Sequence, residues 1–193
     1  QGATKIPYVL NELGDLKLGI AVSCPGVSLL ESDLNYWKNR NEETIDSGIT
    51  DAVKLQRKVY QYIAGTLSKS DLKEAIEVEK NKVWFEHIWT PNLDEIQQDT
   101  KLLYNPIPYF EKTKQPVLVI QGTKDEIIPA DSYKKISMAL EKSGNDRFKT
   151  VLLEDASHSM HNIGQSDFPY WSKLHTDYLP TIEGWLNSIY NLE

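Results

Sequence analysis

The sequence predicts an α/β fold built on a mainly parallel sheet. Three short apolar runs have the length and composition of buried strands, at residues 16–24, 116–122 and 148–154. Helical patterns lie between or after them, and apolar strands that alternate with helices are typical of a parallel sheet covered on both faces. The chain of 193 residues is long enough for one domain with its own core.

Residues at the ends of these segments agree with that fold. The first apolar run stops at Pro25-Gly26 and the second at Gly122, and such residues interrupt regular structure. Residues 131–143 carry apolar side chains at helical spacing, and Gly144 occupies the position of a C-terminal cap. Near the end of the chain a second helical stripe follows Pro180; it comprises Ile182, Trp185, Leu186 and Ile189.

A long stretch between the first two strands has no strong strand signal and is rich in charged and aromatic residues. Ser68 or Ser70 is suited to cap a helix there. We therefore expect a helical cap or lid insertion over residues 29–103. Residues 1–28 and 104–193 are expected to form the α/β core.

Composition excludes several functional classes. The formal net charge is −7, and without a block of Lys or Arg residues the chain is not expected to bind nucleic acid. No apolar run approaches the roughly 20 residues that span a bilayer. Cys24 is the only cysteine, so no internal disulfide forms, and its place at a strand end predicts a small packed side chain.

An acid and an imidazole follow two of the predicted strands. Asp125 comes just after the strand at 116–122, and His158 just after the strand at 148–154. Side chains at the carboxyl ends of neighbouring parallel strands meet at one edge of the sheet. A carboxylate there can accept the Nδ1 proton of the histidine, which leaves Nε2 to remove a proton from a nucleophile.

Other roles compete for these residues. Asp125 is also suited to stabilise a turn, with Glu126 as the substitute acid, and His161 competes with His158. Asp131 is expected to cap the following helix. The pair His158-x-x-His161 alone is weak evidence for a metal site, so no metal or cofactor is predicted.

The segments PVLVIQGTKDEIIP and LLEDASHSM resemble the acid and histidine loops of the α/β-hydrolase superfamily. The stretch YNPIPYF before the second strand is similar to the lead-in of peptidase- and esterase-like members. The resemblance covers most of residues 1–30 and 104–193. It implies the chain order nucleophile, acid, histidine, with Asp125 as the acid and His158 as the histidine.

The nucleophile departs from this pattern, because no G-x-S-x-G occurs in the chain. Ser23, Ser28 and Ser157 lack the glycine-flanked, strained turn of a nucleophilic serine. The opening Gln1-Gly2-Ala3 looks like the piece that follows such a serine, so the resemblance gives the oxyanion N–H to Gln1. We therefore expect the C-terminal half of an α/β-hydrolase, which begins one residue past the serine and is inactive alone.

In the family's sheet order, the first strand here pairs with a strand that precedes the serine. Without that strand, residues 16–24 form an apolar edge, which favours association with another chain. We expect this edge either to retain the missing N-terminal half non-covalently or to self-associate.

These observations predict a serine hydrolase that cleaves a carboxylic ester or a peptide bond. The alternative is a non-catalytic binding module that kept the fold but lacks the nucleophile. The residues immediately before Gln1 distinguish the two, because only the hydrolase has a serine elbow there. Any targeting signal would also lie upstream, so the sequence assigns no localisation.

Overall fold

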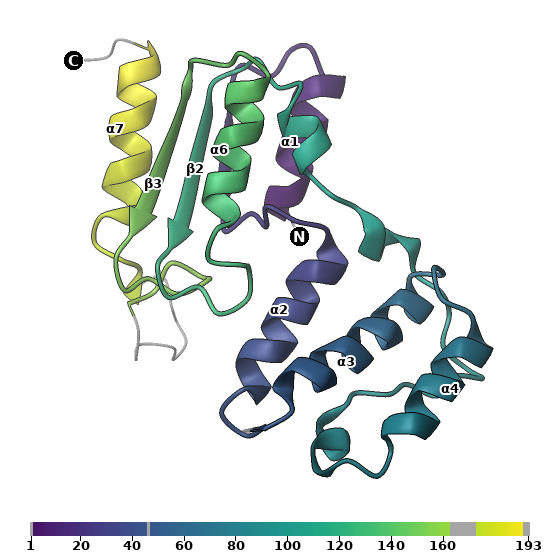
Figure 1. The fold of residues 1–193 in the computed structure, drawn as a ribbon. Coiled ribbons are helices and arrows are strands. Elements are labelled where there is room, and N and C mark those ends of the chain that lie inside the picture. The colour runs from purple at the N-terminus through teal and green to yellow at the C-terminus, as the bar shows by residue number, and fades with distance from the viewer. Residues whose placement is uncertain (1, 46, 163–172, 191–193) are drawn as a thin grey trace. The chain divides into compact units, whose positions relative to one another are not determined.

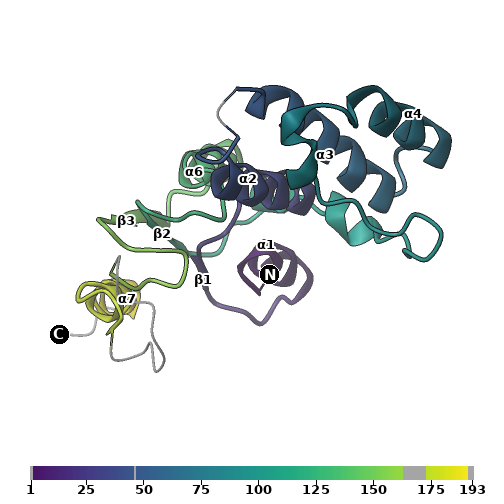
Figure 2. The ribbon, with the colours of Figure 1, turned by 90° about the horizontal axis from the view of Figure 1, so that it is seen from below.

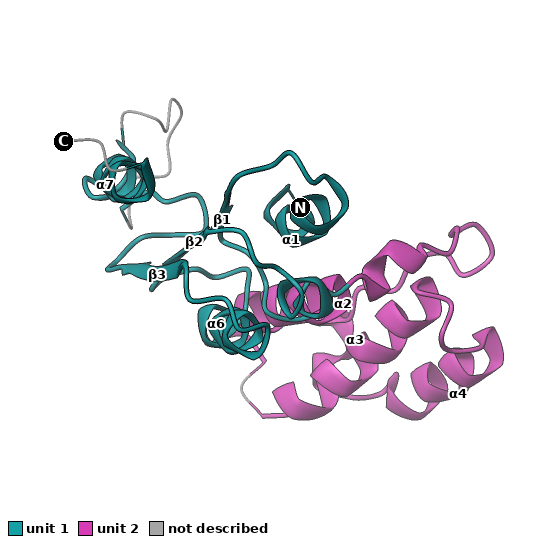
Figure 3. Ribbon diagram, turned by 90° about the horizontal axis from the view of Figure 1, so that it is seen from above, with its two compact units in different colours: residues 1–27, 105–193 teal, residues 28–104 magenta. Residues whose placement is uncertain are grey.

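The computed structural model describes residues 2–45, 47–162 and 173–190 (Figure 1). It divides the chain into two compact units (Figure 3). The first comprises residues 1–27 and 105–193, and the second comprises residues 28–104. Each unit has its own hydrophobic core.

The first unit contains a three-stranded parallel sheet in the order β1-β2-β3. The strands are β1 (Gly19–Val22), β2 (Val117–Gly122) and β3 (Phe148–Leu153). Every residue of the central strand β2 is buried, as expected of a strand with neighbours on both edges and helices on both faces. The predicted α/β fold with a parallel sheet is confirmed.

Strand β1 is shorter than the predicted strand at 16–24. Gly19 pairs with Val117, and the Gly19 N–H donates to the Pro116 carbonyl at 2.9 Å. Pro116 has no N–H to return, so the ladder cannot extend further towards residue 16. At the other end Ser23 leaves strand geometry with a φ of 49°.

The helices among the described residues of the first unit are α1 (Gly2–Glu12), α5 (Ile107–Phe110), α6 (Ser132–Lys142) and α7 (Tyr178–Tyr190). Helices α6 and α7 lie on opposite faces of the sheet (Figure 2). Leu10 of α1 and Ile136 of α6 share a core with Val119 of β2. Trp185 of α7 packs on the other face with Ile120. Because side chains alternate along a strand, neighbouring residues of β2 thus contribute to two different cores.

The ends of α6 confirm one prediction and correct another. Gly144 follows the helix with a φ of 71°, and its N–H donates to the Glu141 carbonyl at 2.8 Å. Asp131 occupies the N-cap position, but its side chain makes no capping hydrogen bond. It instead forms an ion pair with Lys135 at 3.0 Å. The expected capping role of Asp131 is therefore wrong.

The second unit is helical. Its elements are α2 (Leu29–Asn41), α3 (Ile49–Ile63), α4 (Lys69–Glu79), η1 (Val83–His87) and η2 (Thr100–Leu103). Ser68, one of two predicted caps, accepts a hydrogen bond from the Asp71 N–H at 3.1 Å and starts α4. Buried Val59 and Trp84 belong to its core. In the described parts of both units, no helix has the length and apolarity needed to cross a membrane.

Candidate active site

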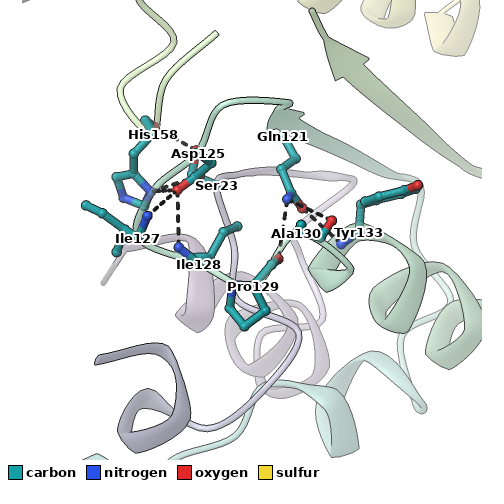
Figure 4. A network of polar contacts seen from close by, with 9 residues as sticks. All are labelled: Ser23, Gln121, Asp125, Ile127, Ile128, Pro129, Ala130, Tyr133 and His158. Atoms are coloured by element: carbon teal, nitrogen blue, oxygen red, sulfur yellow. Dashed lines mark hydrogen bonds and ion pairs between the residues drawn. The ribbon is translucent and has the colours of Figure 1, made fainter. Parts of the chain in front are cut away.

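Asp125 and His158 meet at the carboxyl edge of the sheet (Figure 4). Each follows its strand by a few residues, as the sequence predicts. The Nδ1 atom of His158 lies 3.0 Å from each carboxylate oxygen of Asp125. Their catalytic role stays a prediction, but the contact that this role requires is present.

The Asp125 side chain is held in one position by its own loop. The Oδ1 atom accepts hydrogen bonds from the Ile127 N–H at 3.0 Å and the Ile128 N–H at 3.2 Å. Aspartate commonly bonds in this way to the backbone two or three residues onward. The carboxylate is fully buried, whereas 30% of the His158 side chain is exposed. Asp125 therefore stabilises a turn and contacts the imidazole at once, so these two interpretations do not compete.

Backbone contacts join the acid loop to the histidine loop. The Lys124 N–H donates to the Ala156 carbonyl at 3.0 Å, and the Asp155 N–H donates to the Thr123 hydroxyl at 2.9 Å. Gly122 allows this approach, because a Cβ atom there would lie 2.1 Å from the Ala156 carbonyl oxygen. The sequence indicated only that a strand ends at Gly122. Its closeness to Ala156 depends on pairing between distant segments.

The contact with Asp125 determines which ring nitrogen of His158 is available to other groups. An ionised carboxylate only accepts hydrogen bonds, so the Nδ1 atom that faces Asp125 carries the ring hydrogen and donates the hydrogen bond. In the neutral ring Nε2 is then the basic nitrogen. The side chain is partly exposed, so a group outside the molecule can approach the ring.

The other candidates take different positions. Glu126 is exposed, and His161 is 8% exposed, with its carbonyl accepting a hydrogen bond from the Ser157 N–H at 2.8 Å. Asp125 thus pairs with His158, and this is the pair that the sequence analysis favoured. Within the described ranges no three His, Cys, Asp or Glu side chains are grouped to hold a metal ion. Gln1, the predicted oxyanion donor, lies outside the described residues.

Ser23 has a role that the sequence did not reveal. Its hydroxyl donates a hydrogen bond to the backbone carbonyl of His158 at 2.7 Å. The sequence did not assign Ser23 as a nucleophile, because no glycine flanks it. In the structure its backbone has a positive φ of 49°. Its hydroxyl contacts the His158 backbone, however, rather than the imidazole.

Cys24 behaves as predicted. The residue is 2% exposed and belongs to the core shared by α1, α6 and the sheet. Loss of solvation on burial raises the pKa of its thiol to about 12. A thiol that stays protonated at neutral pH is a packed side chain rather than a nucleophile.

Comparison with known proteins identifies the family. The model of the prolyl oligopeptidase family, Peptidase_S9, matches residues 50–181, which is more than half of the chain. The chain belongs to the prolyl oligopeptidase family. This membership confirms the likeness to α/β-hydrolases inferred from the acid and histidine loops. The matched part of this family member includes both Asp125 and His158. No curated protein matches the chain.

Three solved structures that resemble parts of the chain are an esterase, a meta-cleavage product hydrolase and a proline iminopeptidase. An esterase from Pyrococcus furiosus is 14% identical with a TM-score of 0.45, and the match covers 96% of this chain and 50% of the esterase. A meta-cleavage product hydrolase from Pseudomonas fluorescens is 14% identical with a TM-score of 0.44, covering 97% and 62%. A proline iminopeptidase from Mycobacterium smegmatis is 14% identical with a TM-score of 0.39, covering 97% and 60%. This prolyl oligopeptidase family member thus spans about half the length of the esterase.

Proposed function

We propose that the protein is a serine hydrolase that cleaves a carboxylic ester or a peptide bond, with Asp125 and His158 as two members of its triad. The observation that carries the proposal is the contact between His158 Nδ1 and the buried Asp125 carboxylate. Membership of the prolyl oligopeptidase family supports it. The nucleophilic serine is proposed to lie upstream of residue 1.

In this mechanism His158 Nε2 removes the serine proton as the oxygen attacks the substrate carbonyl carbon. Asp125 keeps the ring in the required tautomer and stabilises the imidazolium. Backbone N–H groups, including that of Gln1, hold the negative charge on the carbonyl oxygen. The imidazolium then gives its proton to the leaving alcohol or amine. Water hydrolyses the acyl-enzyme by the same route, and His158 again acts as base and then as acid.

The test uses a longer protein in which the proposed upstream segment precedes residue 1. Asp125→Asn should lower turnover of p-nitrophenyl esters or aminoacyl substrates by about 10⁴-fold, and His158→Ala by about 10⁶-fold. Glu126→Gln is the matched control, because this exposed acid adjoins Asp125 and should leave turnover nearly unchanged. Unchanged turnover in His158→Ala would remove these residues from the mechanism. A longer protein without a serine elbow would instead indicate the binding module.

The free edge of β1 supports a proposal about partners. The Gly19 N–H donates to the carbonyl of Pro116, just before β2, and the Ser23 N–H donates to the carbonyl of Ile120 in β2, each at 2.9 Å. Hydrogen bonds alternate along a strand, so Ile20 and Val22 direct their backbone groups to the other edge, where no described strand pairs with them. We propose that this edge pairs with the N-terminal half or with a second copy. Size-exclusion chromatography that shows a well-folded monomer of the 193-residue chain would contradict this.

We also propose that residues 29–103 act as a cap that influences substrate choice. The helices of this segment form a core of their own, so the segment is a unit that can be exchanged. Replacing it with a short Gly-Ser linker in the longer protein should change the relative rates on small and large esters. Unchanged relative rates would show that the segment has no part in selection.

A further inference from the structure

Ser23 connects the end of one strand to the loop that carries the candidate base. It follows β1 directly, is 7% exposed, and donates its hydroxyl proton to the His158 carbonyl at 2.7 Å (Figure 4). A distance of 2.7 Å is typical of a well-formed O–H···O hydrogen bond. The bond joins residues far apart in the chain and acts on the backbone of the residue whose ring faces Asp125.

Backbone strain gathers around this bond. Among the described residues, three that are not glycine have positive φ: Ser23 at 49°, Asp155 at 56° and Met160 at 60°. Asp155 and Met160 lie on either side of His158, and Ser23 is bonded to its carbonyl. Such conformations cost free energy and persist only where surrounding contacts impose them. The contacts around His158 therefore hold its loop in a conformation that the chain would not adopt alone.

We propose that Ser23 is a positioning residue for His158. Its hydroxyl fixes the His158 backbone, so the imidazole is presented to Asp125 with Nδ1 towards the carboxylate. Asp125 is already held by two N–H groups of its own loop, which leaves the histidine as the partner that needs a second support. The inference deepens the proposed function and rests on it for its catalytic meaning. The effect on the ring can nevertheless be measured without catalysis.

The experiment measures the tautomer of His158 in the 193-residue chain. The chain has four histidines, so nitrogen-15 labelling of the rings gives a small set of NMR signals that single substitutions can assign. At a pH where the ring is neutral, a proton shared with Asp125 makes Nδ1 pyrrole-like and Nε2 pyridine-like. A ring released from Asp125 exchanges between both tautomers and gives averaged shifts.

Ser23→Ala removes the hydroxyl, and Ser23→Gly removes it while relieving the positive φ. Both should lower the ratio of the Nδ1–H tautomer to the Nε2–H tautomer by about 2- to 10-fold, the effect of one lost hydrogen bond. Ser159→Ala, at an exposed serine of the same loop, is the matched control and should keep the wild-type ratio. Far-ultraviolet circular dichroism confirms that each variant is folded, and Ser23→Gly provides the result if Ser23→Ala does not fold.

A wild-type ratio in either folded Ser23 variant would overturn the positioning role and leave the Asp125–His158 pair intact. Mixed tautomers in the wild-type chain would overturn the pair itself, and the proposed function with it. A shifted ratio in both Ser23 variants, with His158→Ala still active in the longer protein, would support positioning and reject the proposed function. Each outcome therefore identifies which statement fails.

Discussion

Gly122 gives the sharpest prediction about how the site is built. A Cβ atom on this residue would lie 2.1 Å from the carbonyl oxygen of Ala156, 2.6 Å from the Ala156 carbonyl carbon and 2.8 Å from the Ser157 carbonyl oxygen. All three atoms belong to the backbone, so no side-chain rotation can relieve the contact. Gly122→Ala should therefore displace the loop that carries His158.

The size of the effect follows from these distances. Real Cβ atoms essentially never approach within 3.0 Å of such an atom, so Ala156 must move by about 1 Å. That shift stretches the hydrogen bond from the Lys124 N–H, now 3.0 Å long. Overpacking of this kind costs about 1–3 kcal/mol of the free energy of unfolding. A displacement of 1 Å also costs about 10²-fold in rate where geometry governs catalysis.

The assay is urea denaturation followed by circular dichroism, with ester turnover measured in the longer protein. Gly14→Ala is the matched control, because a Cβ atom there meets nothing within 4 Å. The control should stay within about 0.5 kcal/mol of wild type. If Gly122→Ala has the same free energy of unfolding as Gly14→Ala, the two loops are not packed as described.

Three further predictions concern Gly48, Gln56 and Cys24. A Cβ atom on Gly48, which has a φ of 114°, would lie 2.4 Å from Trp84 Cδ1, so Gly48→Ala should cost at least about 2 kcal/mol. An unchanged urea midpoint by tryptophan fluorescence would contradict this. Buried Gln56 bonds to the Trp89 carbonyl at 3.2 Å and to its N–H at 2.9 Å, so Gln56→Leu should cost about 1–3 kcal/mol in the same assay. Equal free energies of unfolding for Gln56→Leu and the wild type would show that these bonds do not contribute to stability. Burial raises the pKa of Cys24 from 9.0 to about 12, so above pH ~9 the unfolded chain releases this proton first and the free energy of unfolding falls. Between pH ~8 and ~10 the free energy of unfolding of the wild type should fall by about 1.4 kcal/mol more than that of Cys24→Ala. Equal decreases in the two proteins would contradict the raised pKa of Cys24.

The parallel sheet could be predicted because apolar runs and helical stripes are local in sequence. The ends of the first strand were predicted less accurately, since β1 stops where Pro116, which precedes the neighbouring strand, lacks an N–H group. Ser68 was one of two predicted caps, and only the structure selects it over Ser70. Asp131 has the residue type of a cap, yet its carboxylate pairs with Lys135 instead. Composition thus predicts elements, whereas tertiary contacts decide their ends.

The candidate site likewise contains residues that could be predicted from the sequence and residues that could not. Asp125 and His158 could be found because each is a chemically distinctive residue just after a predicted strand. The contact between Ser23 and His158 could not be found from the sequence, because the Ser23 hydroxyl bonds to a backbone carbonyl, a group that every residue has. Gly122 was likewise visible only as a strand end until the Ala156 loop was placed against it. Candidate catalytic residues are therefore easier to find from sequence than the residues that position them.

One measurement tests the central claim most directly: whether His158 and Asp125 activate a serine supplied by another segment. The longer protein is treated with a fluorophosphonate, which labels activated serines covalently, and the labelled peptide is sequenced. We predict one labelled serine upstream of residue 1, with labelling lost in His158→Ala and strongly reduced in Asp125→Asn. Labelling of a serine within residues 1–193, or labelling that persists without His158, would contradict the account.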